Sequence, residues 1–278
     1  MQKYELIKRA KLAASVYRDD VNKRIRVDDI HGNLHSLLTI LDMDSQFGDY
    51  EKLIIKARES QFMTLIERGF VHEGVINHYF NGDRAHFMSR FRKEERRTSN
   101  YWGEEDDILS SVQRLRMDPS LKDTKSSILL AEPGQAEELA CLYKEVFQLY
   151  PVPLHNPEYI KDAMNNGTIF VCIRQNEQIV SAASAEINFQ YKNAELTDCA
   201  TLPLYRKGGI MKNLIAKLEE ELLSREIFCA YTIARALSYG MNAVFHQLGY
   251  EYRGRLANNC YIFDKIEDMN LWEKNLGQ

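Results

Sequence analysis

The second half of the chain alternates between apolar runs of strand length and apolar residues at helical spacing. Short apolar runs at 128–131, 168–173 and 179–189 predict strands, and the polar turn at 175–178 predicts that the last two form a hairpin. Between the first two strands, apolar residues recur at helical spacing over 136–147, which predicts a helix that ends at the prolines following it.

The same alternation continues towards the C-terminus. A strand is predicted to end at Pro203 and an amphipathic helix to follow it, while a second helix begins after Ser238 and ends at Gly249. The predicted segments are strand 195–202, helix 210–225, strand 228–234 and two short strands at 250–255 and 259–263. The order β-α-β-β-β-α-β-α-β-β predicts an α/β (α+β) fold, with helices flanking a mixed sheet whose early strands are mostly antiparallel.

Charge and turn residues divide the chain in two. The segment 88–107 is dense in charge, first basic and then acidic, and we expect a solvated helix and loop there that joins two units. Turn-like residues at 118–120 and 122–126 place the boundary near residue 125, which gives domains 1–125 and 126–278.

The first half contains an echo of the second. Residues 54–58 followed by 62–74 resemble 232–235 followed by 245–254, because each pair runs from a strand through a helix to Gly-Phe or Gly-Tyr and then to a strand ending in glycine. The echo predicts that the first half is a partial, degenerate copy of the second. We expect it to act as a scaffold, to shape the pocket, or to contact a second subunit in a homo-oligomer.

Composition narrows the classes of function. Residues 1–125 carry 22 basic and 21 acidic side chains, whereas residues 126–278 carry 14 and 19. The surplus of carboxylates in the second half disfavours nucleic acid and suits a cationic small molecule. No apolar run reaches the roughly 18 residues of a membrane span, and the N-terminus lacks the apolar stretch of a signal peptide. We therefore expect a cytoplasmic protein with no membrane contact.

The cysteines and histidines do not predict a metal site or disulfides. The five cysteines lie far apart without a C-x-x-C pair, so we expect them to be reduced, small core residues. His31 and His35 are four residues apart, but no third ligand can be assigned to them, and we expect a surface position for both.

A basic, glycine-containing turn follows the predicted strand 195–202 and opens the helix at 210. Backbone amides at a helix N-terminus form an anion site that the helix dipole strengthens, and glycines let a pyrophosphate approach the main chain. The residues expected to hold such a group are Arg206, Lys207, Gly208, Gly209, Ile210, Met211 and Lys212. From the turn alone, an ordinary connection with surface basic residues is an equal alternative.

This turn resembles the signature [Q/R]-x-x-G-x-[G/A] of the GNAT acetyltransferases, since Arg206 and Gly209 match its first and fourth positions. Met211 departs from the pattern, which has Gly or Ala there. Residues 245–250 resemble the family pattern Y-x-x-x-G-[F/Y], and the likeness covers roughly residues 126–265. The resemblance implies that acetyl-CoA is the co-substrate and an amine the acceptor.

Three longer blocks, 195–203, 234–254 and 258–264, resemble the beta-lysine N-acetyltransferases. These enzymes acetylate the ε-amine of β-lysine to give a zwitterionic osmolyte, so the resemblance implies a small-molecule amine substrate. Two alternatives stay open: a protein-lysine or polyamine acetyltransferase, and a non-catalytic acyl-CoA-binding module, which Met211 and Phe245 favour because family residues are missing there.

Direct acetyl transfer requires a base, because a lysine-type amine with a pKa near 10.4 arrives charged at neutral pH. Strand 195–202 offers Glu195 and Asp198, which face opposite sides of it. Glu195 matches the position of a glutamate base in some GNAT histone acetyltransferases, and Asp198 alternatively anchors a substrate ammonium or supports the fold. Backbone amides near Thr201 and Leu202 are expected to hold the pantetheine arm and polarise the thioester carbonyl.

Phe245 stands where many GNAT enzymes have a tyrosine that protonates the departing thiolate. The alternatives are Tyr239, Tyr250 or water as the acid, or a thiolate that leaves unassisted. For the acceptor, the predicted pocket residues are Tyr150 and Tyr159 for the aliphatic chain, Glu186 or Asp198 for a second amine, and Arg235 for a carboxylate. The alternative for each is a role in packing or in a surface ion pair.

Overall fold

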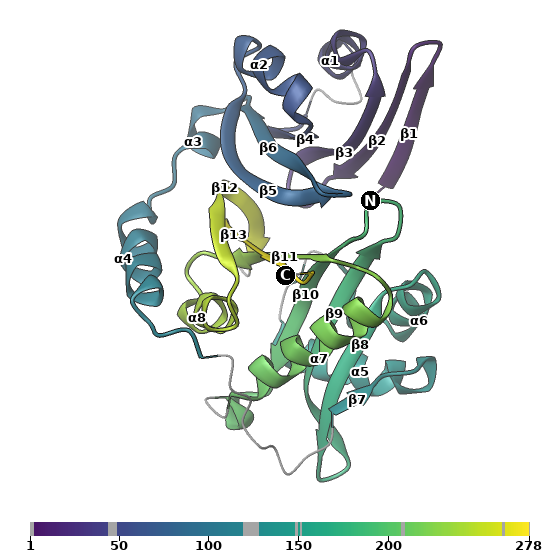
Figure 1. The fold of residues 1–278 in the computed structure, drawn as a ribbon, viewed down its shortest axis with the longest axis vertical. Coiled ribbons are helices and arrows are strands. Elements are labelled where there is room, and N and C mark those ends of the chain that lie inside the picture. Colours follow the sequence, from purple (N-terminus) through teal and green to yellow (C-terminus); the bar gives the residue numbers. More distant parts are fainter. Residues whose placement is uncertain are drawn as a thin grey trace.

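The computed structural model describes residues 3–43, 49–118, 128–147, 150, 152–206, 209–262 and 265–277. The described strands form one sheet with the order β1-β2-β3-β4-β6-β5-β12-β13-β11-β10-β9-β8-β7 (Figure 1). The predicted domain boundary near residue 125 lies outside the described residues. No described helix is both long and apolar enough to cross a membrane.

The second half forms the sheet order β7-β8-β9-β10-β11-β13-β12, and its helices lie on both faces. The α/β class and the mixed sheet are therefore confirmed: β7 to β10 are antiparallel neighbours, and β10 pairs with β11 in parallel. The elements are β7 (Ile128–Leu130), α5 (Ala136–Val146), α6 (Pro157–Asn165), β8 (Ile169–Gln175), β9 (Gln178–Asn188), β10 (Asn193–Thr201), α7 (Ile210–Ser224), β11 (Cys229–Arg235), α8 (Tyr239–Gln247), β12 (Glu251–Ile262) and β13 (Lys265–Asn275).

The first half repeats six of these seven strands in the same relative order. Its parallel pair is β3–β4, which corresponds to β10–β11, and its last hairpin is β5–β6, which corresponds to β12–β13. The elements are β1 (Lys3–Arg9), β2 (Leu12–Asp19), β3 (Arg24–Gly32), α1 (Leu34–Met43), β4 (Lys52–Ala57), α2 (Glu59–Glu67), β5 (Val71–Phe80) and β6 (Asp83–Phe91). The resemblance between the two halves in sequence is thus accompanied by the same order of six strands.

The two halves join where β5 meets β12, at the pair Gly74 and Gly254. A Cβ on Gly254 would lie 2.2 Å from the carbonyl oxygen of Glu73, and one on Gly74 would lie 2.7 Å from that of Arg253. Gly254 also has a φ of 140°, which side chains rarely allow. Both glycines are therefore required for the two half-sheets to become one.

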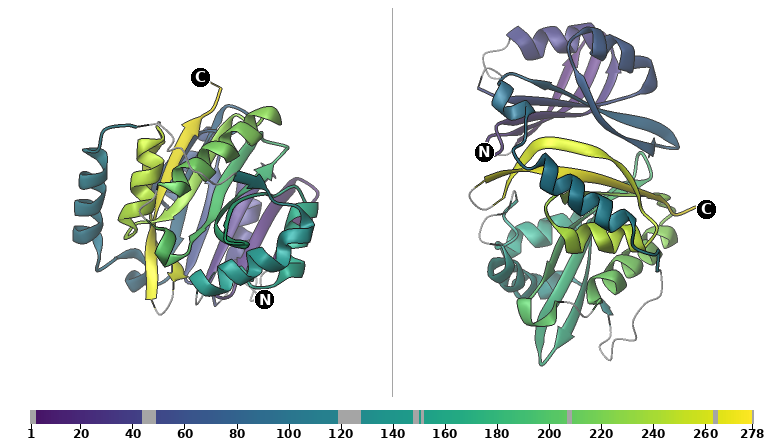
Figure 2. Two further views of the ribbon diagram at one scale, coloured as in Figure 1. Left: turned by 90° about the horizontal axis from the view of Figure 1, so that it is seen from below. Right: turned by 90° about the vertical axis from the view of Figure 1, so that its left-hand side faces the viewer.

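Helices α3 (Glu94–Arg97) and α4 (Trp102–Gln113) cross between the halves, and α4 packs beside α8 (Figure 2). The expectation of a solvated connection is wrong in part, because Arg96 and Glu105 are buried. Arg96 donates to the Asn22 carbonyl over 2.6 Å, and the Trp102 indole donates to Asp268 over 2.9 Å. The connection is therefore bonded to both halves.

The end of the chain differs from its prediction. The two short strands expected at 250–255 and 259–263 are one strand, β12, with irregular register, and β13 was not predicted. Four of its polar residues, Glu267, Asp268, Asn270 and Glu273, are buried. They make bonds to distant residues, such as the one from Trp102 to Asp268, so the strand lacks the apolar pattern that marks a buried strand.

The five cysteines are free. Cys172, Cys229 and Cys260 are buried in strands and Cys199 is half-buried, but Cys141 is exposed on α5, which contradicts the expectation that all are core residues.

Glu105 makes stability depend on pH. Burial and the nearby Asp268 carboxylate raise its pKa to about 8 from an ordinary value of 4.5. Between these values the folded protein keeps a proton that the unfolded chain loses, so the free energy of unfolding falls as pH rises through this interval. Glu105→Gln should remove this fall, which we expect to amount to roughly 1–2 kcal/mol.

Urea unfolding at pH 5 and pH 9 measures the effect. Glu104→Gln, an exposed neighbour on the same helix, is the control and should keep the wild-type pH dependence. Equal pH dependence in wild type and Glu105→Gln would contradict the role of Glu105.

Candidate active site

The two parallel strands of the second half separate soon after they begin. β10 and β11 pair over Asn193–Glu195 and Cys229–Tyr231 and no further, and the β10–β9 register shifts between Thr197 and Ala200. Asp198 lies in this bulge with a φ of 52°. A cavity of about 450 Å³ opens at the separation, lined by residues of both halves of the chain.

Three carboxylates form one wall of the cavity. Glu186 on β9 and Glu195 on β10 are register partners, and Asp198 follows on β10. The Tyr231 hydroxyl donates to Glu195 over 3.2 Å, and the Ser184 hydroxyl donates to Asp198 over 2.6 Å. We call Glu186, Glu195 and Asp198 the acidic wall.

Desolvation disfavours the ionised state of two of these carboxylates, Glu186 and Asp198. Burial first, and then the carboxylates of Asp198 and Glu195, raise the pKa of Glu186 to about 8. Burial raises the pKa of Asp198 to about 6, although hydrogen bonds from Ser184 and Tyr150 act in the opposite direction. A ligand cation would relieve this cost, because an opposite charge favours the ionised carboxylate.

Aromatic side chains cover the acidic wall from the α5–α6 region. Tyr150 lines the cavity, stacks on Phe147 at 4.4 Å between ring centroids, and lies 3.5 Å from Thr197 between hydroxyl oxygens. Tyr159 on α6 also lines the cavity, and burial raises its pKa. The structure thus brings together Tyr150, Tyr159 and the three carboxylates predicted from the sequence.

A second part of the lining comes from the first half of the chain and is basic. Arg26 on β3 lines the cavity; its Nε lies 2.7 Å from Asp28 Oδ1, and Lys56 Nζ lies 2.9 Å from the same oxygen. The Asp28 carboxylate thus pairs with two cations, and these cations hold its pKa well below the usual range. We call Arg26, which lines the cavity, and Lys56, which does not line it but holds Asp28 beside Arg26, the basic wall.

The prediction for Arg235 is corrected. Its guanidinium makes two bonds of 2.8 Å to the buried Glu267, so its charge is already neutralised by the protein. Sequence reasoning missed Arg26 in its place. The echo held the signal: Arg26 is the register partner of Ile54, as Glu195 is of Tyr231, so the two residues occupy corresponding positions in the two halves.

The predicted phosphate-binding turn leads into α7. Gly209 precedes the helix with a φ of 75°, and Arg206 donates from Nε to the Thr201 carbonyl over 3.0 Å. Lys212 pairs with Asp118. Lys207 and Gly208 lie outside the described residues.

The Leu202 amide donates to the Val180 carbonyl over 3.0 Å, so it is already engaged and does not fit the predicted role of holding the pantetheine arm.

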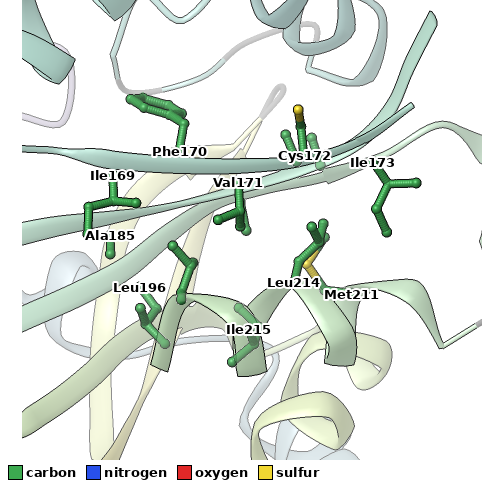
Figure 3. Packing of buried hydrophobic residues seen from close by; sticks show 14 of the residues in the cluster. Ile169, Phe170, Val171, Cys172, Ile173, Ala185, Leu196, Met211, Leu214 and Ile215 are labelled. Carbon is green, nitrogen blue, oxygen red and sulfur yellow. The ribbon is translucent and has the colours of Figure 1, made fainter. Parts of the chain in front are cut away.

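Met211, where the family pattern has a small residue, does not face the turn. It is buried and lies beside Leu214 on the face of α7 that packs against the sheet (Figure 3). Ile210 belongs to the same buried cluster. The departure from the signature therefore fills the core and does not narrow the turn.

The side chains that could protonate a departing thiolate also differ from the GNAT family pattern, which has a tyrosine at position 245. Phe245 is buried and lines the cavity, whereas Tyr239 is 46% exposed and neither Tyr239 nor Tyr250 lines it. Ser238, which sequence reasoning had considered only as a helix cap, does line it. Within the described ranges, no group of three or more His, Cys, Asp or Glu side chains is arranged to hold a metal ion.

Comparison with known proteins agrees with this geometry. Residues 135–250 match the acetyltransferase (GNAT) family. The chain is similar to N-acetyltransferase YodP of Bacillus subtilis (strain 168), with 37% identity over 273 residues that cover 97% of this chain and 98% of that protein. It is also similar to two proteins named beta-lysine N(6)-acetyltransferase. The one from Methanococcus maripaludis is 34% identical over 92% of this chain and 93% of its own, and the one from Methanosarcina mazei is 36% identical over 73% and 83%.

The separated parallel strands, the turn that opens α7 and these similarities lead to one conclusion. The chain belongs to the GNAT family of acetyltransferases, and it is an acetyl-CoA-dependent N-acetyltransferase.

Proposed function

We propose that this enzyme acetylates the ε-amine of β-lysine. The observation that carries the proposal is the acidic wall, because three carboxylates that line one cavity suit a substrate with more than one ammonium group. The names of two relatives similar over most of the chain support the same acceptor.

Acetyl-CoA enters from the α7 side in this proposal. The N-terminal amides of α7, together with Arg206 and Gly209, hold the pyrophosphate, and the thioester reaches the gap between β10 and β11. Backbone amides along this gap polarise the carbonyl, which accumulates negative charge as the amine attacks.

Glu195 takes the proton from the ε-ammonium, directly or through water. It lines the cavity beside the last paired residues of β10 and β11, where the acceptor and the thioester meet. Asp198 and Glu186 hold the ammonium groups of the substrate, and Tyr150 and Tyr159 pack along its methylene chain. The departing thiolate takes its proton from Ser238 or water, since both Phe245 and the two nearby tyrosines are unsuited by chemistry or position.

Turnover with acetyl-CoA and defined acceptors tests the proposal. Mass spectrometry of the products from β-lysine, spermidine and lysine-containing peptides should detect a single acetyl group on the ε-nitrogen of β-lysine, at a rate well above those of the other acceptors. Faster turnover of spermidine or of the peptides would contradict the proposed acceptor.

Glu195→Gln should lower kcat for β-lysine about 10²- to 10⁴-fold, because the amine loses the group that accepts its proton. The deficit should shrink as pH approaches 10, where the amine is neutral in solution. Glu137→Gln, an exposed change on α5, is the matched control and should behave as wild type. An unchanged rate of Glu195→Gln at limiting amine would remove this residue from the reaction.

Asp198→Asn should raise KM for β-lysine roughly 10- to 100-fold, because an ammonium loses its ionised partner. In wild type, kcat/KM should fall as pH drops through about 6, where Asp198 takes up a proton, and the variant should lack this inflection. Ser184→Ala should move the inflection to higher pH, because the lost hydrogen bond favours the ionised carboxylate. An inflection that persists in Asp198→Asn would assign it to another group.

A further inference from the structure

The basic wall is the part of the cavity that the acetyl-transfer reaction does not use. Arg26, which lines the cavity, and Lys56, which supports it through Asp28, come from the first half of the chain, outside the residues 135–250 that match the GNAT family. An acceptor that carried only amines would gain nothing from these cations and would be repelled by them. These cations would be complementary to a negative group on the acceptor, while the acidic wall holds its ammonium groups.

Three arginines line the cavity, and two are already neutralised. Arg24 lies 2.9 Å from Asp19 and also donates to the Asn259 carbonyl over 3.1 Å. Arg235 donates through Nε and Nη2 to Glu267, whose carboxylate also lies 3.9 Å from Lys265 Nζ. Arg24 and Arg235 are thus each paired with a buried carboxylate.

Arg26 shares its carboxylate, Asp28, with Lys56 at 2.9 Å, so these three side chains carry one more positive than negative charge. The further carboxylates that interact with Arg26 are Glu195 and Glu186 of the acidic wall. The Arg26 Nε donates to Asp28 and its Nη2 to the Tyr4 hydroxyl over 3.0 Å, which leaves Nη1 without an acceptor among the described residues. The guanidinium carbon lies 5.0 Å from the centroid of the Tyr17 ring, which helps to fix its orientation.

The geometry points to Arg26 as the residue that binds the carboxylate of the acceptor, so that the first half of the chain selects a diamino acid over a polyamine. This inference rests on the proposed function of the cavity and adds a specificity residue to it. A zwitterionic chain would lie across the cavity with its ammonium groups at the acidic wall and its carboxylate at Arg26. Arg26 and Glu195 hold corresponding register positions in the two halves and line one cavity, so each half would supply a partner of one sign for the substrate.

Lys56 is suited to support this role and not to replace it. Its ammonium group is buried, donates to the Tyr79 hydroxyl over 2.9 Å, and lies 4.9 Å from the centroid of the Tyr79 ring. It thereby fixes Asp28, which in turn orients the Arg26 fork. A planar guanidinium that keeps one free edge is also the better partner for a carboxylate.

Matched pairs of acceptors test the inference. Removing the carboxylate of β-lysine gives pentane-1,4-diamine, and removing that of lysine gives pentane-1,5-diamine, so each pair differs only in the group that Arg26 should bind. Wild type should have a kcat/KM for β-lysine at least tenfold above that for pentane-1,4-diamine. Arg26→Met should lower kcat/KM for the acid roughly 10- to 100-fold and change that for the diamine by less than about threefold.

Two further variants control for folding and charge. Arg26→Lys keeps the charge without the fork and should fall between wild type and Arg26→Met, while Arg84→Met, an exposed change on β6, should leave both substrates unaffected. Equal losses for acid and diamine in Arg26→Met, or no preference for the acid in wild type, would overturn the inference.

The outcomes also separate this inference from the proposed acceptor. A strong preference for lysine over β-lysine that still disappears in Arg26→Met would overturn β-lysine as the acceptor and support Arg26 as the carboxylate site. Turnover of β-lysine as the preferred acceptor, with an unchanged preference for the acid in Arg26→Met, would support β-lysine as the acceptor and overturn Arg26 as the carboxylate site. An enzyme that acetylates none of the four compounds would overturn both.

Discussion

The contact between Gly74 and Gly254 is the constraint on which the rest of the molecule depends. Two backbones meet there so closely that a side chain on either residue would collide with the other strand, and this contact makes two half-sheets continuous. The two halves share a strand order, and they join through equivalent strands, β5 and β12. Residues of both halves then line one cavity. The active site is therefore a property of the joined sheet, and neither half would contain it alone.

The cavity holds charges that cost free energy when it is empty. Three carboxylates, of which Asp198 is buried, line the cavity together with a basic cluster, and desolvation raises the pKa values of Glu186 and Asp198 to about 8 and about 6. Such an arrangement is poor for stability but suited to binding, because a substrate with complementary charges removes much of the cost when it enters. The first half of the chain thus has a chemical role in this account and is more than a scaffold.

Sequence patterns predicted what local periodicity encodes. The strands and helices from 128 to 250 follow apolar spacing except for α6, which was not predicted, so the region around α7 and its turn was predicted closely, as were the carboxylates of the acidic wall. β13 was missed because its buried polar residues are stabilised by partners far away in the sequence, such as Trp102 with Asp268. Arg26 was missed for a related reason: the resemblance between the two halves marks its position, but only the fold shows that β3 lines the same cavity as β10.

The central claim is that the cavity exchanges protons for the ammonium groups of a diamino acid. Calorimetric titration of β-lysine into the complex with CoA, at pH 7 and in two buffers of different ionisation enthalpy, measures the protons released on binding. Because Glu186 is largely protonated at this pH before the ligand enters, the account predicts a net release of protons. Binding without proton release, or no binding at millimolar β-lysine, would contradict it.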